Sequence, residues 1–374
     1  MTDSDDWAAS LSGPPKKPMK RGTKIFLWLF AALVAWLTLS NATWLAPDPV
    51  GKRVLIAHRG VSQLFDHRGV TDDSCTATRI YPPEHAYIEN SLPSMKVAIG
   101  RDAGAVKFDV AATKDGRLAV FHDWTLDCRT DGKGDIRDRT MAELKRLDIG
   151  FGYTADGGKT FPLRGKGVGL MPSLDDVLRD LGHASLIVNF KSRDPREGAL
   201  ALAAFARAGI DPNQPRFGFF GNARVLRPIR ARAPRAWTLD PEGAKRCTGD
   251  YIKFGWSGWY PPSCVGGTIM VPLDYQWAYW GWPDRLQARA AAHGTRVLMT
   301  GARGDKQGGM GLWRVDQLTR IPASFTGYVW IDDIYNLGPA LRPPARPPAS
   351  HEQPPTSAST PARTWTGSQN LAMA

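Results

Sequence analysis

Eight runs of strand-forming residues alternate with helical segments between residues 54 and 333 of this chain. The runs occupy residues 54–60, 105–113, 185–191, 216–221, 236–240, 268–274, 295–301 and 327–333. Most connecting segments have helical patterns, for example Ser91–Arg101, Ser173–Leu181, Glu197–Ala208 and Asp284–His293. Strands separated by helices form parallel sheets, so eight such units predict an α/β fold, a (βα)8 TIM-like barrel. A doubly wound sheet is the alternative, but no glycine-rich fingerprint follows the first run.

Polar residues stand at the end of almost every predicted strand, where the active sites of such barrels lie. They are His58-Arg59, Asp109, Asn189 with Lys191, Asn222, Asp240, Asp274 and Asp332-Asp333. Side chains two apart on a strand share a face, so Lys107 and Asp109 should point the same way. The stretch that follows them delivers His122 and Asp123. This pattern predicts a site at the carboxyl ends of the strands.

The apolar run Ile25–Leu45 is long enough to cross a bilayer as a helix. Basic residues precede it, namely Lys16, Lys17, Lys20, Arg21 and Lys24. The positive-inside rule therefore predicts a single-pass anchor, with residues 1–24 as a disordered cytoplasmic tail and the barrel outside. A cleaved signal peptide is the alternative, since Ser40-Asn41-Ala42 is a passable cleavage site.

The predicted barrel occupies about residues 53–339, and the Pro-rich segment 342–374 should be disordered because it cannot bury a core. Four cysteines outside the cytoplasm would pair, and we favour the local pairs Cys75–Cys128 and Cys247–Cys264 over four free thiols.

The formal net charge of +12 favours anionic partners such as phosphate esters or acidic lipid headgroups. The chain has no zinc-finger spacing, RNA-binding aromatic motif or dense basic helix, so we expect no nucleic-acid partner.

Several linked motifs follow one another along the predicted barrel: "IAHRG", "ENSLPSM" and "KFDVAATKDGRLAVFHDWTLDCRTDGKG", then "MPSLDDVL", "VNFK" and, more loosely, "YVWIDD". Together they resemble the glycerophosphodiester phosphodiesterase family. The resemblance implies a βα barrel that hydrolyses a glycerol- or lipid-derived phosphodiester. Such cleavage needs a base for the attacking oxygen and an acid for the leaving alkoxide, roles that the resemblance gives to His58 and His122. Arg59, Lys107 and Lys191 would bind the phosphate.

Two positions depart from the family pattern. Where relatives carry a glutamate that binds a divalent cation with Asp109 and a later glutamate, this chain has Lys107, and the later position is Asn189. Glu89 and Asp109 remain, so we expect either no metal or a weakly bound Ca²⁺ or Mg²⁺. Lys107 would then supply the positive charge that the metal supplies in relatives. The alternative is a decayed barrel that binds phosphorylated envelope components without turnover.

The segment Val61–Ile88 is longer than a connecting loop requires and should lie over the barrel mouth, where it would shape substrate choice. It contains a second His-Arg-Gly at His67–Gly69. We interpret this motif either as part of the chemistry of the insertion or as a coincidence. The Trp-rich stretches 254–264 and 275–283 form another candidate surface for a lipid, a sugar or the membrane interface, although core packing explains much of them.

Overall fold

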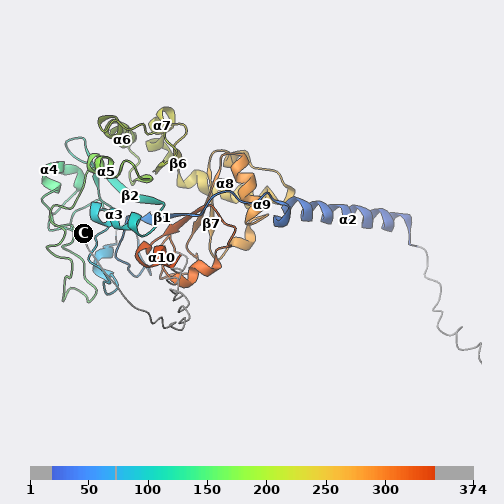
Figure 1. Ribbon diagram of the computed structural model, residues 1–374, viewed down its shortest axis with the longest axis horizontal. Helices are drawn as coiled ribbons and strands as arrows, with labels where there is room; N and C mark the ends of the chain where they lie inside the picture. The colour runs from blue at the N-terminus through green and yellow to red at the C-terminus, as the bar shows by residue number, and fades with distance from the viewer. Residues whose placement is uncertain (1–18, 72–73, 342–374) are drawn as a thin grey trace, which may run out of the picture. The chain divides into compact units, whose positions relative to one another are not determined.

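The computed structural model describes residues 19–71 and 74–341. Eight parallel strands form a nearly closed barrel in the order β6-β5-β4-β2-β1-β9-β8-β7. Figure 1 shows helices lying around these strands. The strands are β1 Val54–His58, β2 Ala105–Ala112, β4 Leu186–Phe190, β5 Phe217–Phe220, β6 Trp237–Leu239, β7 Thr268–Pro272, β8 Arg296–Thr300 and β9 Tyr328–Ile331. Each lies within one of the eight predicted runs, so the barrel prediction is confirmed and the doubly wound alternative is excluded. The short strand β3, Leu118–Val120, pairs antiparallel with β2 and precedes His122; it is not one of the eight barrel strands.

Helices cover the outside of this barrel. They are α3 Leu92–Gly100, α4 Met141–Leu144, α5 Leu174–Leu181, α6 Pro195–Arg207, α7 Ala223–Arg232, α8 Pro241–Phe254, α9 Asp284–Ala292 and α10 Ile334–Ala340. Short 3₁₀ helices complete the connections: η1 Thr43–Leu45, η2 Thr76–Arg79, η3 Ile136–Asp138, η4 Gly255–Ser257, η5 Pro262–Cys264, η6 Gln276–Ala278 and η7 Val315–Arg320. Side-chain caps explain several starts, since Ser91, Ser173 and Asp240 accept hydrogen bonds from backbone N–H groups of the first turns of α3, α5 and α8.

The two-residue period of the strands separates two apolar layers. In β1, Leu55 and Ala57 pack with the outer helices, whereas Ile56 packs inside the barrel with Leu298 and Trp330. Alternation along β1 therefore places His58 on the same side as Ile56, towards the barrel interior. The packing of β1 thus directs the His58 side chain into the barrel mouth, the opening at the carboxyl ends of the strands.

The barrel has a seam between β6 and β7, the two ends of the strand order. Side chains bridge this seam, because Trp237 Nε1 donates to Thr268 Oγ1 at 3.0 Å. Thr248 Oγ1 of α8 accepts a hydrogen bond from the backbone N–H of Met270 in β7 at 3.0 Å. Cys247 of α8 and Cys264 of η5 also form a disulfide beside the seam.

Both predicted disulfides are confirmed. The Cα–Cα distances are 5.4 Å for Cys75–Cys128 and 4.6 Å for Cys247–Cys264. The first joins the long insertion after β1 to the segment after β3, and the second holds α8 to η5.

The N-terminal helix α2, Arg21–Asn41, has 21 residues and a mean hydropathy of 1.7 over its most apolar window, which suffices for a membrane span by length and composition. The same properties fit a signal sequence. Asn41 Nδ2 donates to the Trp256 carbonyl at 2.8 Å, and Arg289 donates to the Ser40 carbonyl at 2.6 Å. The tail predicted at 342–374 and residues 1–18 of the predicted cytoplasmic tail lie outside the described residues.

Candidate active site

His58 and Arg59 follow each other at the carboxyl end of β1. His58 Nδ1 lies 2.7 Å from Asp332 Oδ1, just after β9, and the other oxygen of Asp332 accepts the Gly311 N–H at 2.9 Å. Arg59 has a φ of +70°, and its backbone N–H donates to the Lys107 carbonyl at 2.6 Å. This left-handed turn is uncommon for a non-glycine residue, so it indicates that surrounding contacts hold Arg59 in place.

Lys107 and Asp109 share a face of β2, as predicted. Lys107 Nζ lies 2.6 Å from Asp109 Oδ1, and Asn189 Nδ2, on the neighbouring strand β4, donates to the same oxygen at 2.7 Å. Arg59 Nε approaches the second oxygen at 3.4 Å. Burial lowers the pKa of Lys107 to about 8 despite the attraction of Asp109. Burial opposes ionisation of Asp109, but Lys107 and neighbouring cations keep its pKa well below the usual value.

Glu89 is buried beside two guanidinium groups. Its Oε1 accepts from Arg59 at 2.8 Å and lies 3.7 Å from Arg129. Burial alone would raise the pKa of Glu89, but Arg129 and Arg59 lower it to about 2. Glu89 is therefore a fixed negative charge that positions Arg59 in the mouth.

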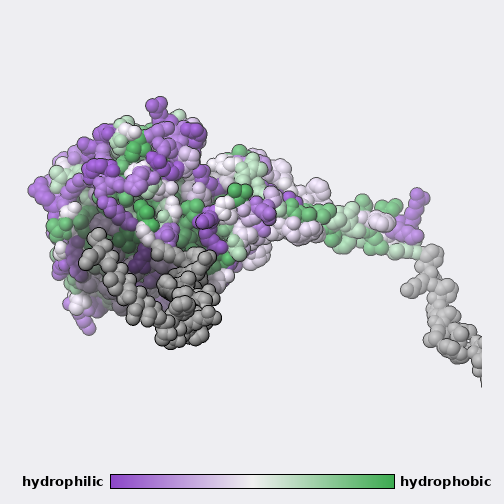
Figure 2. Space-filling model, in the orientation of Figure 1, coloured by the Kyte–Doolittle hydropathy of each residue, from purple (hydrophilic) through white to green (hydrophobic). Residues whose placement is uncertain are grey.

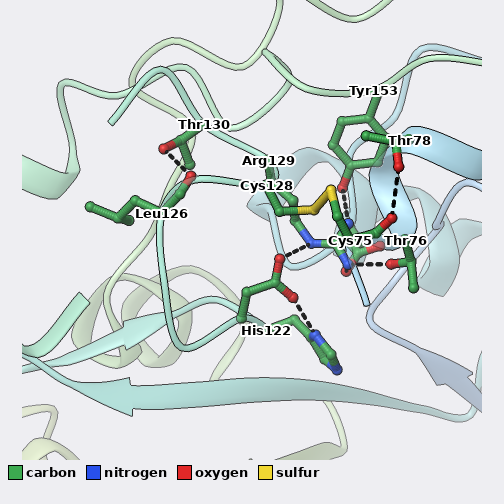
Figure 3. The surroundings of a disulfide bond; sticks show 11 residues. Cys75, Thr76, Thr78, His122, Leu126, Cys128, Arg129, Thr130 and Tyr153 are labelled. Atoms are coloured by element: carbon green, nitrogen blue, oxygen red, sulfur yellow. Dashed lines mark hydrogen bonds and ion pairs between the residues drawn. A yellow bond between two sulfur atoms is a disulfide. The ribbon is translucent and has the colours of Figure 1, made fainter. Parts of the chain in front are cut away.

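His122 is held by a chain of contacts that begins at the Cys75–Cys128 disulfide (Figure 3). His122 Nδ1 lies 2.7 Å from Asp123 Oδ1, whose second oxygen lies 3.0 Å from Arg129 Nε. Arg129 directly follows Cys128 and donates at 2.7 Å to Thr76, the residue after Cys75. The disulfide thus joins the two segments that fix Arg129, and Arg129 in turn fixes Asp123 and His122.

Lys191 completes the group from the end of β4. Its Nζ lies 3.0 Å from His122 Nε2. Since ammonium groups only donate, Nε2 accepts here, and Nδ1 carries the proton that is shared with Asp123. His58 Nδ1 also carries a proton, because it faces the Asp332 carboxylate, which only accepts hydrogen bonds. His58 Nε2 therefore keeps a lone pair.

The two imidazoles are more accessible than the Lys107–Asp109 pair beside them. Their side chains are 18% and 19% exposed, whereas Lys107 is 4% and Asp109 0% exposed. Burial, followed by the charge of Lys107, lowers the pKa of His58 to about 4. Burial, followed by the charge of Arg59, does the same for His122. Both rings are therefore neutral near pH 7.

Residues of the insertion after β1 lie over His58, as predicted from its length. A small recess of about 30 Å³ is lined by His58, Arg59, Ser62, Gln63, Leu64, Phe65, His67, Glu89 and Asp332. The rings of Phe65 and His67 stack at 3.9 Å between centroids. His67, from the second His-Arg-Gly, thus belongs to the wall of the site. This position favours a part in the chemistry of the insertion over a coincidence of sequence.

The carboxylates of this cluster do not fit a divalent metal. Hard cations need several free anionic oxygens, but Lys107, Arg59 and Asn189 surround Asp109, and two arginines face Glu89. Within residues 19–71 and 74–341, no three His, Cys, Asp or Glu side chains are grouped so as to hold a metal ion.

Sequence reasoning placed the seven predicted site residues at the mouth but missed their partners. Asp332 was noted only as a polar strand end, although closure of a barrel must bring the last strand beside the first. Asp123 was noted beside His122 without a role. No sequence pattern pointed to Arg129, because its contacts with Glu89 and Asp123 depend on how the loop after β3 folds.

Residues 58–200 match the model of the Glycerophosphoryl diester phosphodiesterase family. Over this segment the chain resembles that family, and the match covers less than half of the chain. The matched segment contains His58, Glu89, Lys107 and His122, whereas Asp332 lies beyond it.

Curated relatives in the family align over part of their length. A glycerophosphodiester phosphodiesterase of Bacillus subtilis is 32% identical over 163 residues, which cover 42% of this chain and 46% of the relative. One from Caldanaerobacter subterraneus is 35% identical over 103 residues, covering 28% of this chain and 39% of the relative. The chain thus spans less than half the length of these relatives.

Solved structures extend the family likeness to the whole barrel as a fold. The glycerophosphoryl diester phosphodiesterase domain of a Mycobacterium tuberculosis protein superposes with a TM-score of 0.55 at 14% identity, covering 77% of this chain and 98% of that one. A putative family member from Silicibacter pomeroyi gives a TM-score of 0.50 at 20% identity, covering 80% and 95%.

Proposed function

We propose that this chain hydrolyses phosphodiesters of the glycerophosphodiester type by histidine acid–base catalysis. The observation that carries the proposal is a pair of accessible imidazoles, each held through Nδ1 by a carboxylate at 2.7 Å, in a mouth lined with cations. Such a pair can activate an attacking oxygen and protonate a leaving alkoxide. The match of residues 58–200 to the phosphodiesterase family supports the same reaction class.

His58 is the base in this proposal. Its Nε2 is free to accept a proton, and Asp332 stabilises the imidazolium that forms when it does. A pKa of about 4 keeps His58 unprotonated at neutral pH. The cost is weak basicity, which the negative charge of a bound phosphodiester offsets by raising the pKa of the imidazole.

His122 is the acid, and the charge balance of the mouth supports this role. Four cations (Arg59, Lys107, Arg129 and Lys191) face four carboxylates (Glu89, Asp109, Asp123 and Asp332), so the site with neutral histidines has no net charge. A bound phosphodiester adds one negative charge and therefore favours uptake of one proton. His122 would take that proton while the Lys191 ammonium turns from Nε2 to a phosphate oxygen.

Arg59 and Lys191 bind the phosphate oxygens, and Lys107 acts from beneath them. Because Lys107 is nearly buried and paired with Asp109, its role is electrostatic: it stabilises the charge of the transition state, as a metal ion would. Glu89 and Asp109 orient these cations. Activity in this proposal does not depend on a tightly held metal.

The helix α2 is the membrane anchor in this proposal, with the barrel outside the cytoplasm. Its length, its hydropathy and the preceding basic residues support this orientation, and the two disulfides fit an oxidising compartment. N-terminal sequencing of the protein from its native membrane distinguishes an intact anchor from a cleaved signal peptide. After cleavage the mature chain would begin at Thr43.

Turnover of glycerophosphoglycerol by the purified full chain tests the proposal. His58→Ala and His122→Ala should each lower kcat by about 10²–10⁴-fold, the range expected for general acid–base groups. His293→Ala, at an exposed position after α9, is the matched control and should retain activity. A wild-type protein that binds glycerol phosphate without cleaving any diester would instead be the binding protein considered as the alternative.

A further inference from the structure

A large groove lies beside the catalytic mouth, at the carboxyl ends of β7 and β8. Its volume of about 710 Å³ falls within the range of about 300–1,000 Å³ for small-molecule sites. One wall is a single face of α8, formed by Lys245, Thr248, Gly249 and Ile252. The others are Met270, Pro272, Tyr275, Ala278 and Tyr279, and then Thr300–Arg303 with Gly309 and Met310. None of the residues assigned to catalysis above lines this groove.

The groove and the catalytic mouth share one wall. A Cβ atom at Gly309 would lie 2.5 Å from Asp332 Oδ2 and 2.7 Å from His67 Cε1, so this residue separates the groove from the catalytic recess. Two residues later, the Gly311 N–H binds Asp332, the partner of His58. A ligand in the groove therefore extends to the edge of the mouth.

The surface around the groove is unlike the rest of the barrel. Among the described residues from 51 to 251, Val168 is the only exposed large hydrophobic side chain. The next 29 residues of the sequence expose Ile252, Phe254, Trp256, Trp259, Val265, Tyr275, Trp277 and Trp280. In Figure 2 the surface over α8 and α9 is correspondingly paler than the purple surface over α4 to α7. Contiguous exposed apolar surface marks an interaction site, and tryptophan and tyrosine favour the membrane interface.

This aromatic surface meets the end of the apolar helix α2. The Asn41 side chain donates to the Trp256 carbonyl, and Arg285 and Arg289 of α9 donate to the Leu39 and Ser40 carbonyls at 3.2 and 2.6 Å. The segment that carries the aromatic side chains is thus tied to the helix that reaches the bilayer. The helix α8, which lines the groove, therefore leads through η4 to the segment that contacts α2.

We propose that the substrate is an amphiphilic lipid phosphodiester, whose acyl chain lies in the groove while its phosphodiester reaches His58. This proposal rests on the phosphodiesterase function above and names its substrate class. Ile252, Met270, Tyr279 and Met310 supply apolar contacts for the chain. Lys245 and Arg303 give the rest of the groove positive charge, which favours an anionic amphiphile. A small water-soluble diester would leave the groove empty.

The test compares two diesters with the same headgroup. Full-length protein in phosphatidylcholine nanodiscs is given lysophosphatidylglycerol, which enters the bilayer, or glycerophosphoglycerol, which stays in water. Gly249→Phe fills the groove, because a Cβ atom at Gly249 would meet no atom within 4 Å. Val168→Phe, at an exposed position in the loop between α4 and α5, is the matched control.

We expect Gly249→Phe to lower kcat/KM for the lysolipid at least tenfold more than for the soluble diester, since losing two buried methylene groups already costs about this factor. Val168→Phe should change neither. An equal loss for both diesters, or a wild-type preference for the soluble one, would overturn the lipid proposal and leave the phosphodiesterase function standing.

If wild-type protein cleaves neither diester, the proposed function fails. A binding experiment then tests separately whether the groove holds a lipid chain. A lysophosphatidylglycerol with a photoactivatable diazirine in its chain is irradiated with the His58→Ala protein in the same nanodiscs. Adducts in residues 245–252 that disappear with Gly249→Phe support the groove as the lipid site. Adducts confined to α2 refute it.

Discussion

Replacing Lys107 by methionine removes a buried cation and keeps a side chain of similar length. Lys107 Nζ lies 6.0 Å from the centre of the Trp330 ring, against which the His58 ring packs at 5.1 Å. We use the same separation of about 6 Å for the negative charge that develops on a substrate held beside His58. At an effective dielectric constant of about 20, Lys107 then stabilises that charge by about 2.8 kcal/mol. We therefore expect Lys107→Met to lower kcat about a hundredfold, in the range for removal of one preorganised charge.

The pH profile separates this electrostatic role from a structural one. With a pKa of about 8 for Lys107, wild-type activity should fall as the pH rises through 8, because the lysine loses its charge there. Folding stability should change in the opposite direction. Since the pKa of a lysine in the unfolded chain is about 10.4, the unfolded state binds more protons between these values and stability rises with pH. Unfolding through this group cannot imitate the loss of activity.

The assay is release of glycerol phosphate from glycerophosphoglycerol, followed by ³¹P NMR at temperatures where circular dichroism shows the variant folded. That check matters because one partner of a buried pair is removed, which costs about 3–5 kcal/mol of stability. Lys96→Met breaks the exposed pair with Asp180 and is the control. If Lys107→Met stays within threefold of wild type and keeps the decline above pH 8, the reasoning about Lys107 is wrong.

Three further outcomes are expected. Exhaustive chelation should leave the wild type largely active, whereas glutamate at both 107 and 189 should create a requirement for added Ca²⁺ or Mg²⁺; complete, metal-reversible loss in the wild type would contradict this. Replacing both cysteines of the Cys75–Cys128 bridge by serine should lower the free energy of unfolding by about 4 kcal/mol, against about 3 for the other bridge, because the closed loops span 53 and 17 residues. Only the first replacement should also lower kcat, since Arg129 then loses its support; equal kinetic effects would refute that. Acidification from pH 6.5 to 4 should destabilise the protein, because His122, with its pKa lowered to about 4, stays neutral when the unfolded histidine is protonated, a difference of roughly 3 kcal/mol. Urea titrations should show that His122→Gln loses less stability over this range.

The sequence was sufficient for the barrel because its strands are buried on both faces and read as apolar runs between helical segments. All eight barrel strands were found, and the apolar run before His122 corresponds to the short strand β3. The Lys107–Asp109 contact followed from the two-residue period of a strand. In each of these cases the signal is local.

The partners of the catalytic candidates were harder to find because they come from distant parts of the chain. Asp332 is 274 residues from His58, and Arg129 reaches Glu89 only through the loop that the disulfide fixes. The groove escaped notice because Lys245, Gly249 and Ile252 look like one face of an ordinary helix. Its shape depends on how far β7 and the loop after β8 stand from that helix.

The seam between β6 and β7 gives this barrel a natural point of division. Every other neighbouring pair in the strand order is joined by a backbone ladder, whereas this pair meets through the Trp237 and Thr268 side chains. The chain therefore consists of an N-terminal piece ending with β6 and a C-terminal piece beginning with β7, which associate through the ladder between β1 and β9. A circular permutant that begins near Gly258, between η4 and η5, would preserve every ladder, and the Cys247–Cys264 disulfide would then tie its new ends together.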